Sequence, residues 1–307
     1  GYSSSGEVVQ TGKGVSNFHT GDRVVSNGNH AEYVVVNQNL CTRIPDNTDI
    51  KEASFTVLGS IALHGLRLSE TSLGSKVVVI GLGIIGQLVC RLAEAQGSEV
   101  IGIDPDTKRT DLSANFYTSV EEANMTNVDS VIITAATSSN EPIEVATKIA
   151  RNKAKIVVVG DIPLNISRND FYYKELELVV SKSYGPGRYD KQYEILGKDY
   201  PIEYVRWTEN RNFETFIKLL SQNQIHLLDL VTEEVPFENA PSIYKKFSGE
   251  DKPLSIVLRY DNKSEPKIDL QRTVELEPKT EKVNLGILGA GNFASTTILP
   301  ILKELKK

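Results

Sequence analysis

The sequence predicts an α/β protein in which a doubly wound parallel sheet interrupts a β-rich segment. Three observations support this prediction. Strand-like apolar runs alternate with helical stretches between residues 76 and 180, as they do in parallel sheets. A glycine-rich turn, residues 81–86, joins the first of these runs to a helix. The first 40 residues instead hold short apolar runs separated by Gly, Asn and Ser, which are typical of strands and turns.

Composition excludes several classes of protein. The 307 residues suggest about two domains, and 34 basic against 40 acidic side chains give a net charge of −6. Because the chain has no basic excess, nucleic acid is not an expected partner. The longest apolar run, residues 77–89, contains three glycines and a glutamine and is too short to span a membrane. Two cysteines and the absence of a signal-peptide pattern predict a cytoplasmic location.

The elements follow in chain order from the spacing of apolar residues. Runs at 7–9, 23–25 and 32–36 predict strands, and the spacing over 50–68 predicts a helix. The continuous run Lys76–Ile80 predicts a strand buried on both faces. Later strands are expected at 99–103, 128–135, 155–159 and 176–180, with helices at 84–96 and 142–151.

The chain changes character after residue 180. Residues 183–209 are rich in Gly, Tyr, Arg and Asp, which favours a functional loop region. Residues 261–282 are charged and poor in apolar side chains, as in a linker. Beyond them, 283–288 predicts a new buried strand that leads into a second glycine turn and a helix. Between the loop region and the linker, helices are expected at 213–222 and 240–247, and strands near Val235 and at 254–258.

The first glycine turn, Gly81-Leu-Gly-Ile-Ile-Gly86, has the spacing of a dinucleotide fingerprint between a strand and a helix. Gly81 permits the tight turn, Gly83 lets the backbone approach a pyrophosphate, and Gly86 allows close packing of the helix on the strand. The helix N-terminus offers free N–H groups to phosphates. The sequence therefore predicts a Rossmann domain. Its expected cofactor-binding residues also include Ile84, Ile85, Ala135 and Gly160.

Asp104 ends the next strand, 18 residues beyond Gly86. A carboxylate at this place accepts hydrogen bonds from the ribose 2′-OH of NAD and repels the 2′-phosphate of NADP. Lys108 and Arg109 are close enough in sequence to soften that preference. We therefore expect NAD in preference to NADP. The alternative role for Asp104 is to cap the following helix.

Several stretches resemble the medium-chain dehydrogenase/reductase family. Phe18–Val24 is similar to its FxxGDRV turn, Ala31–Val34 to its AEY strand, and Ile61–Gly65 to the helix that enters its cofactor domain. The resemblance implies a GroES-like catalytic domain formed by both ends of the chain around a Rossmann domain. The implied division is a partial GroES-like domain (1–70), a Rossmann domain (71–185) and a return to the catalytic domain (186–260).

Zinc members of this family carry a GHExxG motif, and the matching segment here is Gly1–Gly6. The ligand His is replaced by Tyr2 and the acid by Ser3, and a later ligand position falls on Val57. The four-cysteine structural zinc lobe is absent from the sequence. Tetrahedral zinc needs N, S or carboxylate donors, so we expect neither a catalytic nor a structural zinc.

Without zinc, another group must stabilise the alkoxide or move the proton during hydride transfer. Arg188 and Arg206 are candidates to clamp a carboxylate or phosphate, and Trp207 can stack on a ring. An ion-paired loop or a dimer contact is the alternative for this region. The candidate proton donors are Tyr2, Tyr184 and Tyr189.

Together the segments resemble bacterial bi-domain oxidoreductases, in which a zinc-less medium-chain half is fused to a glucose-fructose-oxidoreductase-like half. Gly289–Ala294 resembles the first turn of that second half. The resemblance implies a sugar or nucleotide-sugar substrate and a role in surface polysaccharide synthesis. Because the chain starts inside one motif and stops inside another, we expect truncation at both ends and a missing second oxidoreductase domain in cis. A homodimer through residues 176–181 is a further expectation.

The sequence thus predicts a zinc-independent, NAD-linked oxidoreductase that acts on a carbohydrate alcohol or carbonyl. An NADPH-dependent reductase of quinones or enones is one alternative. Another is a non-catalytic nucleotide-binding module of a larger enzyme. A lyase or epimerase that holds NAD tightly is the third.

Overall fold

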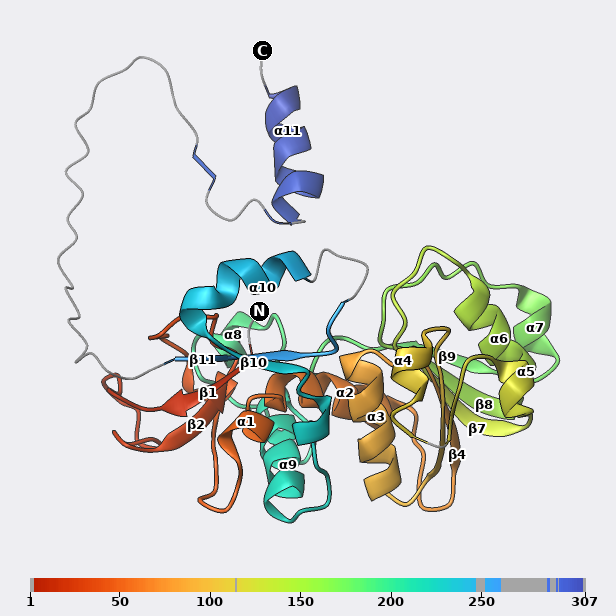
Figure 1. Cartoon of the computed structure of the whole chain (residues 1–307), viewed down its shortest axis with the longest axis horizontal. Helices are drawn as coiled ribbons and strands as arrows, with labels where there is room; N and C mark the ends of the chain where they lie inside the picture. The colour runs from red at the N-terminus through yellow and green to blue at the C-terminus, as the bar shows by residue number, and fades with distance from the viewer. Residues whose placement is uncertain are drawn as a thin grey trace. The chain divides into compact units, whose positions relative to one another are not determined.

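The computed structural model of the chain describes residues 3–113, 115–246, 252–260, 286–287, 291 and 293–305 (Figure 1). It divides into two compact units, residues 1–261 and 262–307. Tyr2, the linker 261–282 and most of the strand predicted at 283–288 lie outside the described residues.

The first unit is built on a six-stranded parallel sheet in the order β6-β5-β4-β7-β8-β9. Neighbouring strands pair in parallel throughout. This is the doubly wound order 3-2-1-4-5-6, in which the direction of winding reverses between β4 and β7. The predicted α/β fold is confirmed. The strands are β4 (Lys76–Ile80), β5 (Glu99–Ile103), β6 (Phe116–Tyr117), β7 (Val128–Ile133), β8 (Ala150–Val158) and β9 (Glu177–Val180).

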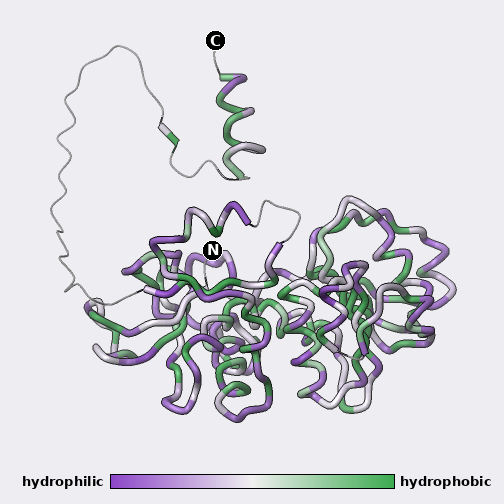
Figure 2. The backbone as a smooth tube through the Cα atoms, viewed as in Figure 1, coloured by the Kyte–Doolittle hydropathy of each residue, from purple (hydrophilic) through white to green (hydrophobic). Residues whose placement is uncertain are grey.

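Both faces of this sheet are covered, which explains the continuous apolar runs of its strands. Val77 and Val79 pack in one hydrophobic cluster with α2 (Thr56–Leu68) and α3 (Ile84–Ala95). Val78 and Ile80 point to the other face, in a cluster with α6 (Glu141–Ile149). Figure 2 shows hydrophobic residues gathered along the sheet. Shorter helices complete the domain: α4 (Thr107–Thr110), α5 (Val120–Ala123) and α7 (Arg168–Tyr172).

The β-rich part begins with an antiparallel sheet, β1-β2-β3. The strand predicted at 32–36 is wrong. Residues 34–37 have no regular structure, and Val35 is fully exposed, so its apolar side chains find no sheet to cover. The helix predicted at 50–68 is two helices that meet at Ser54 and Phe55. The elements here are β1 (Ser4–Glu7), β2 (Arg23–Ser26), η1 (Gln38–Leu40), β3 (Cys41–Arg43) and α1 (Ile50–Ala53).

The chain returns to this part after the Rossmann sheet. Helix α9 (Glu209–Ser221) packs against α2, and its buried residues Phe216 and Ile217 join the same core as α3. A parallel pair, β10 (Glu233–Pro236) and β11 (Ile256–Arg259), follows. The remaining helices are α8 (Lys191–Glu194), η2 (Leu228–Leu230), η3 (Phe237–Asn239) and α10 (Ala240–Lys246).

Of the second unit, the structure describes mainly a helix, formed by a π-helical turn η4 (Ala294–Ile298) and by α11 (Leu299–Glu304). This agrees with the helix expected at the end of the chain. Most of the predicted glycine turn before it lies outside the described residues. Within the described parts of both units, no helix has the length and apolar character needed to cross a membrane. The boundaries at 70 and 185, the second domain in cis and the homodimer stay predictions.

Candidate functional site

The glycine turn between β4 and α3 leaves no room for side chains. Gly81 has a φ of +96°, and a Cβ there would lie 2.5 Å from the backbone nitrogen of Ala135. A Cβ on Gly86 would lie 1.9 Å from the carbonyl oxygen of Gly81. Gly83 caps α3, and its own Cβ would meet the guanidinium of Arg109 at 3.0 Å. Bare backbone therefore faces the space in front of α3, as the fingerprint requires.

The start of α3 supplies donors to that space. The first four N–H groups of a helix have no partner within the helix, and those of Ile84 and Ile85 are among them. The helix dipole adds partial positive charge at the same end. Both features favour a bound pyrophosphate.

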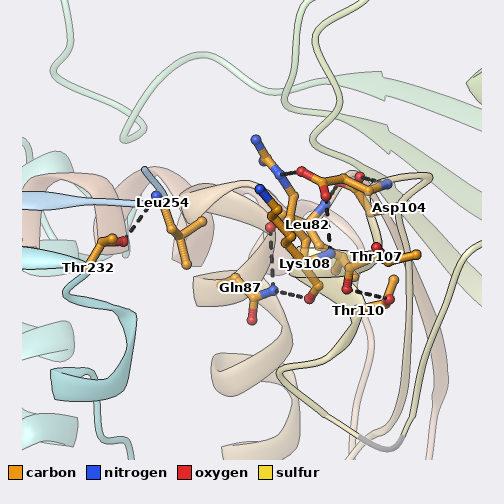
Figure 3. A network of polar contacts seen from close by, with 10 residues as sticks. Leu82, Gln87, Asp104, Thr107, Lys108, Thr110, Thr232 and Leu254 are labelled. Atoms are coloured by element: carbon orange, nitrogen blue, oxygen red, sulfur yellow. Dashed lines mark hydrogen bonds and ion pairs between the residues drawn. The ribbon is translucent and has the colours of Figure 1, made fainter. Parts of the chain in front are cut away.

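The Asp104 side chain is hydrogen-bonded directly to the glycine turn (Figure 3). One carboxylate oxygen accepts a hydrogen bond from the N–H of Leu82 at 2.7 Å, and the other accepts one from the N–H of Asp106 at 2.9 Å. The side chain is 8% exposed. Asp106, rather than Asp104, is the N-cap of α4, since its carboxylate accepts from the N–H of Lys108. Asp104 thus joins the end of β5 to the turn after β4.

The two predicted basic residues lie on α4 beside this turn. The Nε of Arg109 pairs with the Asp106 carboxylate at 3.2 Å. Gln87, which the sequence analysis missed, is buried, and its amide nitrogen lies 3.4 Å from the carbonyl oxygens of both Leu82 and Arg109 (Figure 3). In the sequence, nothing about a single Gln in an apolar helix indicates that it joins the glycine turn to α4.

Ala135 and Gly160 meet at the carboxyl edge of the sheet, where the winding reverses. The N–H of Ala135 donates to the carbonyl of Ile80 at 3.1 Å, and a Cβ on Gly160 would lie 2.0 Å from the carbonyl oxygen of Ala135. Thr134, also missed from the sequence, donates its hydroxyl to the Gly81 carbonyl. Ligands of open α/β sheets bind in the crevice at this reversal point, so the structure brings the predicted cofactor residues to one edge.

Among the candidate catalytic residues, Tyr184 lies beside the position matched to a zinc ligand. It is fully buried in a cluster with Leu40, Val57 and Phe213. Its hydroxyl accepts a hydrogen bond from the Asn27 amide at 3.4 Å. Burial raises the pKa of Tyr184 to about 12, so it is a neutral hydrogen-bond donor near pH 7.

Arg188 and Tyr189 contact one another, but Arg188 is half-buried and Tyr189 is exposed. Arg188 forms an ion pair with Glu194 at 2.6 Å, and its guanidinium lies 4.2 Å from the centre of the Tyr189 ring. Tyr189 is 66% exposed. The Arg188 guanidinium also lies 4.9 Å from the Tyr184 ring. Its charge is therefore already matched by Glu194 in this conformation.

Arg206 lies elsewhere. Its guanidinium stacks on Trp207, 3.8 Å from the ring centre, and among the described residues it forms no hydrogen bond with Tyr184, whereas Arg188 is paired with Glu194. The structure therefore does not combine Arg188 and Arg206 into one clamp. Trp207 was expected to stack on a ring of the ligand, but in the structure its own ring stacks with the Arg206 guanidinium.

Glu209 is a buried acid that the sequence analysis did not single out. It begins α9, it is fully buried, and neither carboxyl oxygen has a hydrogen-bond partner among the described residues. Burial, with a further contribution from Glu194, raises the pKa of Glu209 to about 8. In sequence, an acid after the N-cap Thr208 looks like an ordinary exposed first-turn residue.

The described residues at the matched zinc positions do not present metal donors. Val57 is an aliphatic side chain with no exposure, and the Ser3 hydroxyl donates to the Ser54 carbonyl. Over the described ranges, no group of three or more His, Cys, Asp and Glu side chains is placed to hold a metal ion. Among the described residues, the donor set does not fit a tetrahedral zinc site.

Comparisons with known proteins agree with this two-part organisation. The family described as "Alcohol dehydrogenase GroES-like domain" matches residues 1–46. The family described as "D-isomer specific 2-hydroxyacid dehydrogenase, NAD binding domain" matches residues 59–169. The first match falls on the β1-β2-β3 sheet, and the second begins within α2 and covers the glycine turn.

Individual proteins are similar over most of the chain. D-guloside 3-dehydrogenase of Escherichia coli is 25% identical over 274 residues, covering 82% of this chain and 74% of the relative. The crystal structure of galactitol-1-phosphate dehydrogenase from Escherichia coli has a TM-score of 0.68 at 21% identity, covering 83% of this chain and 82% of that one. A short chain alcohol dehydrogenase (rspB) from Escherichia coli, complexed with NADH, has a TM-score of 0.66 at 17% identity, covering 83% and 81%.

In both parts the chain is therefore similar to medium-chain dehydrogenases/reductases of the zinc-type alcohol dehydrogenase family, which combine a GroES-like domain with an NAD-binding domain. It is an oxidoreductase of the NAD(P)-linked dehydrogenase class.

Proposed function

We propose that this chain transfers hydride between a nicotinamide cofactor, NAD in preference to NADP, and a carbohydrate alcohol or carbonyl, without zinc. The relatives named for D-guloside and galactitol-1-phosphate support a carbohydrate substrate. The bound cofactor supplies the hydride acceptor or donor. The protein binds it, orients it and handles the substrate proton.

The hydrogen bond from the Leu82 N–H to the Asp104 carboxylate is the observation that supports the preference for NAD over NADP. Each carboxylate oxygen of Asp104 accepts one backbone N–H, and a carboxylate oxygen has a second lone pair to offer a ribose hydroxyl. A 2′-phosphate would meet this fixed negative charge. The Arg109 guanidinium is paired with Asp106, which limits its use as a phosphate ligand.

The absence of zinc donors at Ser3 and Val57 shifts the proton chemistry to other groups. Tyr184 is the described candidate next to Val57, and Asn27 fixes its hydroxyl. We assign to Tyr184 the hydrogen bond that stabilises the substrate oxygen. Tyr2, Arg188 and Tyr189 stay predicted catalytic residues.

Cofactor titration tests the first part of the proposal. NADH and NADPH are titrated separately while cofactor fluorescence and protein melting temperature are followed. We expect saturable binding of both nicotinamides, with NADH at least about tenfold tighter, the effect of one charge-assisted hydrogen bond. Tighter binding of NADPH would contradict the assignment of Asp104.

Metal and activity measurements test the second part. We expect elemental analysis of the purified protein to show no stoichiometric zinc, and NAD-dependent oxidation of sugars or polyols to survive chelation. Loss of activity on chelation with recovery on zinc addition would contradict zinc independence. NAD bound in the purified protein with no NADH release on any sugar would favour the lyase or epimerase alternative.

A further inference from the structure

The backbone around Tyr184 forms a tight turn. Ser183 before it has a φ of +49° and Gly185 after it has a φ of +105°, so both neighbours lie in the left-handed region. The N–H of Gly185 closes the turn on the Lys182 carbonyl at 3.1 Å. Left-handed backbone at a residue other than glycine persists only where surrounding contacts hold it. The contacts of this turn therefore determine where the Tyr184 side chain lies.

One of these contacts comes from Asn212, a fully buried residue near the start of α9. Its amide nitrogen donates to the backbone carbonyl of Tyr184 at 3.0 Å. Among the described residues, no backbone N–H donates to that carbonyl, and Tyr184 is itself fully buried. A buried carbonyl without a partner is costly, so the Asn212 amide stabilises the turn in this position.

The amide group of Asn212 can face only one way. Its oxygen accepts a hydrogen bond at 3.0 Å from the Nε of Arg67, which belongs to α2. A guanidinium has donors only. Burial and the charge of Arg206 lower the pKa of Arg67 to about 10, so Arg67 is still charged near pH 7. The amide oxygen must therefore face Arg67, which leaves the amide nitrogen for Tyr184.

Helices α2 and α9 both approach the turn closely at Gly185. A Cβ on Gly185 would lie 3.1 Å from the Asn212 amide nitrogen and 3.1 Å from Nδ1 of His64, on α2. The residue after Asn212 on α9, Phe213, has its ring centre 5.5 Å from that of Tyr184. Helix α9 thus contacts both the backbone and the ring of Tyr184.

We propose that Asn212 is a positioning residue for Tyr184: through the Tyr184 carbonyl, it holds the hydroxyl where that group stabilises the substrate oxygen. This inference rests on the role given to Tyr184 in the proposed function. The hydroxyl has a single hydrogen bond, to Asn27 at 3.4 Å, so its position also depends on the backbone that carries the ring. A misplacement of about 1 Å at a reacting centre can lower a rate about 100-fold.

The first test measures the placement of Tyr184 without any substrate. The 12 tyrosines of the full chain are labelled as fluorotyrosine, and Tyr184→Phe and Tyr193→Phe identify two of the fluorine NMR resonances. Asn212→Asp keeps the acceptor for Arg67 but replaces the donor to Tyr184 with a second acceptor. We expect the Tyr184 resonance to shift or broaden. The Tyr193 resonance should stay, because the Tyr193 hydroxyl is bonded to Thr208, the N-cap of α9.

The second test asks whether Asn212 affects turnover through Tyr184. D-sorbitol, galactitol and galactitol 1-phosphate are offered with NAD, and the fastest substrate is used. We expect Asn212→Asp to lower kcat at least about tenfold, while KM changes less than about twofold. In the Tyr184→Phe background, Asn212→Asp should lower kcat no further. A merely structural role would lower it in both backgrounds.

Asn210→Asp is the matched control. Asn210 lies on the same helix, and its amide nitrogen also donates to backbone carbonyls, those of Asn39 at 3.0 Å and Cys41 at 2.9 Å. This variant should lower stability without changing kcat or the Tyr184 resonance. If Asn212→Asp does not fold, Asn212→Ser removes both amide bonds without adding a charge, and it should give the same changes.

An unchanged Tyr184 resonance in the Asn212 variant would overturn the proposal, and so would losses of kcat that add in the double variant. Failure of the proposed function looks different. Full turnover in Tyr184→Phe, or no oxidation of any of the three substrates, would contradict the role of Tyr184 in the reaction. The fluorine resonance alone would then decide whether Asn212 positions Tyr184.

Discussion

Asp104 accepts a hydrogen bond from the backbone N–H of Leu82 at 2.7 Å, across 22 residues of sequence. The carboxylate at the end of β5 and the glycine turn after β4 therefore form one unit. A change at Asp104 affects cofactor choice and the shape of the turn together. Predictions about this residue must separate the two effects.

We expect Asp104→Asn to lower NADH affinity about tenfold and to reduce the preference over NADPH. The amide oxygen can still accept from the Leu82 N–H, but the amide nitrogen cannot accept from the Asp106 N–H, and the negative charge is lost. Hydrogen bonds to charged groups are worth about 1.5–3 kcal/mol. Fluorescence titration of both cofactors measures the ratio. Asp111→Asn, on the exposed C-cap of α4, is the control. An unchanged ratio of NADH to NADPH affinity in Asp104→Asn would refute the proposed role.

We expect Gly86→Ala to destabilise the protein by about 1–3 kcal/mol, because the new methyl group would lie 1.9 Å from the Gly81 carbonyl oxygen. Gly6→Ala is the matched control, since a Cβ there meets nothing within 4 Å. Urea unfolding measures both free energies. Equal stability of the two variants would show that the turn tolerates the methyl group.

Glu209 should make stability fall as pH rises. Its pKa is about 8 in the folded protein, above the ordinary value of 4.5, so between these values the folded state holds a proton that the unfolded state has released. The free energy of unfolding then decreases with pH, by at most about 1.4 kcal/mol per pH unit. His64 titrates in the unfolded state near 6.5, so pH 6.5–8 is the clear window.

Glu209→Gln removes this titration, and we expect its stability to depend less on pH in that window than that of the wild type. Melting temperatures at half-unit intervals of pH measure the difference. Glu203→Gln, an exposed acid in the preceding loop, should keep the wild-type slope. A Glu209→Gln profile parallel to the wild type would mean that the carboxyl group is ionised in the fold.

We expect Tyr184→Phe to lower turnover at least about 100-fold with only a small loss of stability, about 1 kcal/mol. The lost hydroxyl makes a single bond of 3.4 Å, to Asn27, while the ring keeps its packing on Phe213. Tyr193→Phe is the control, because Tyr193 is equally buried and its hydroxyl donates to the Thr208 hydroxyl, away from Val57 and Asn27. Full turnover in Tyr184→Phe would remove it from the catalytic group.

The sheet and its glycine turn were predictable because their determinants are local. The apolar runs Lys76–Ile80 and Glu99–Ile103 became β4 and β5 with the expected bounds. The strand predicted at 32–36 did not form because a short apolar run alone does not supply a neighbouring strand. Val35 is exposed there instead.

In the candidate site, too, some residues could be placed from the sequence and others could not. The glycines and Asp104 lie within one βαβ unit, so their spacing in sequence fixes their meeting in space. Arg188 and Arg206 are close in sequence, yet one pairs with Glu194 and the other stacks on Trp207. Sequence distance in a long loop region does not determine which partner each side chain finds.

The sequence by itself determined the parallel sheet, the dinucleotide turn and the acid at the end of β5, since each follows from short-range periodicity and backbone sterics. Only the tertiary structure decided that Glu209 is buried without a partner, that Tyr184 packs on Val57, and that Arg67 meets Arg206 across Trp207. Those relationships depend on how α9 packs against α2. No local pattern encodes that packing.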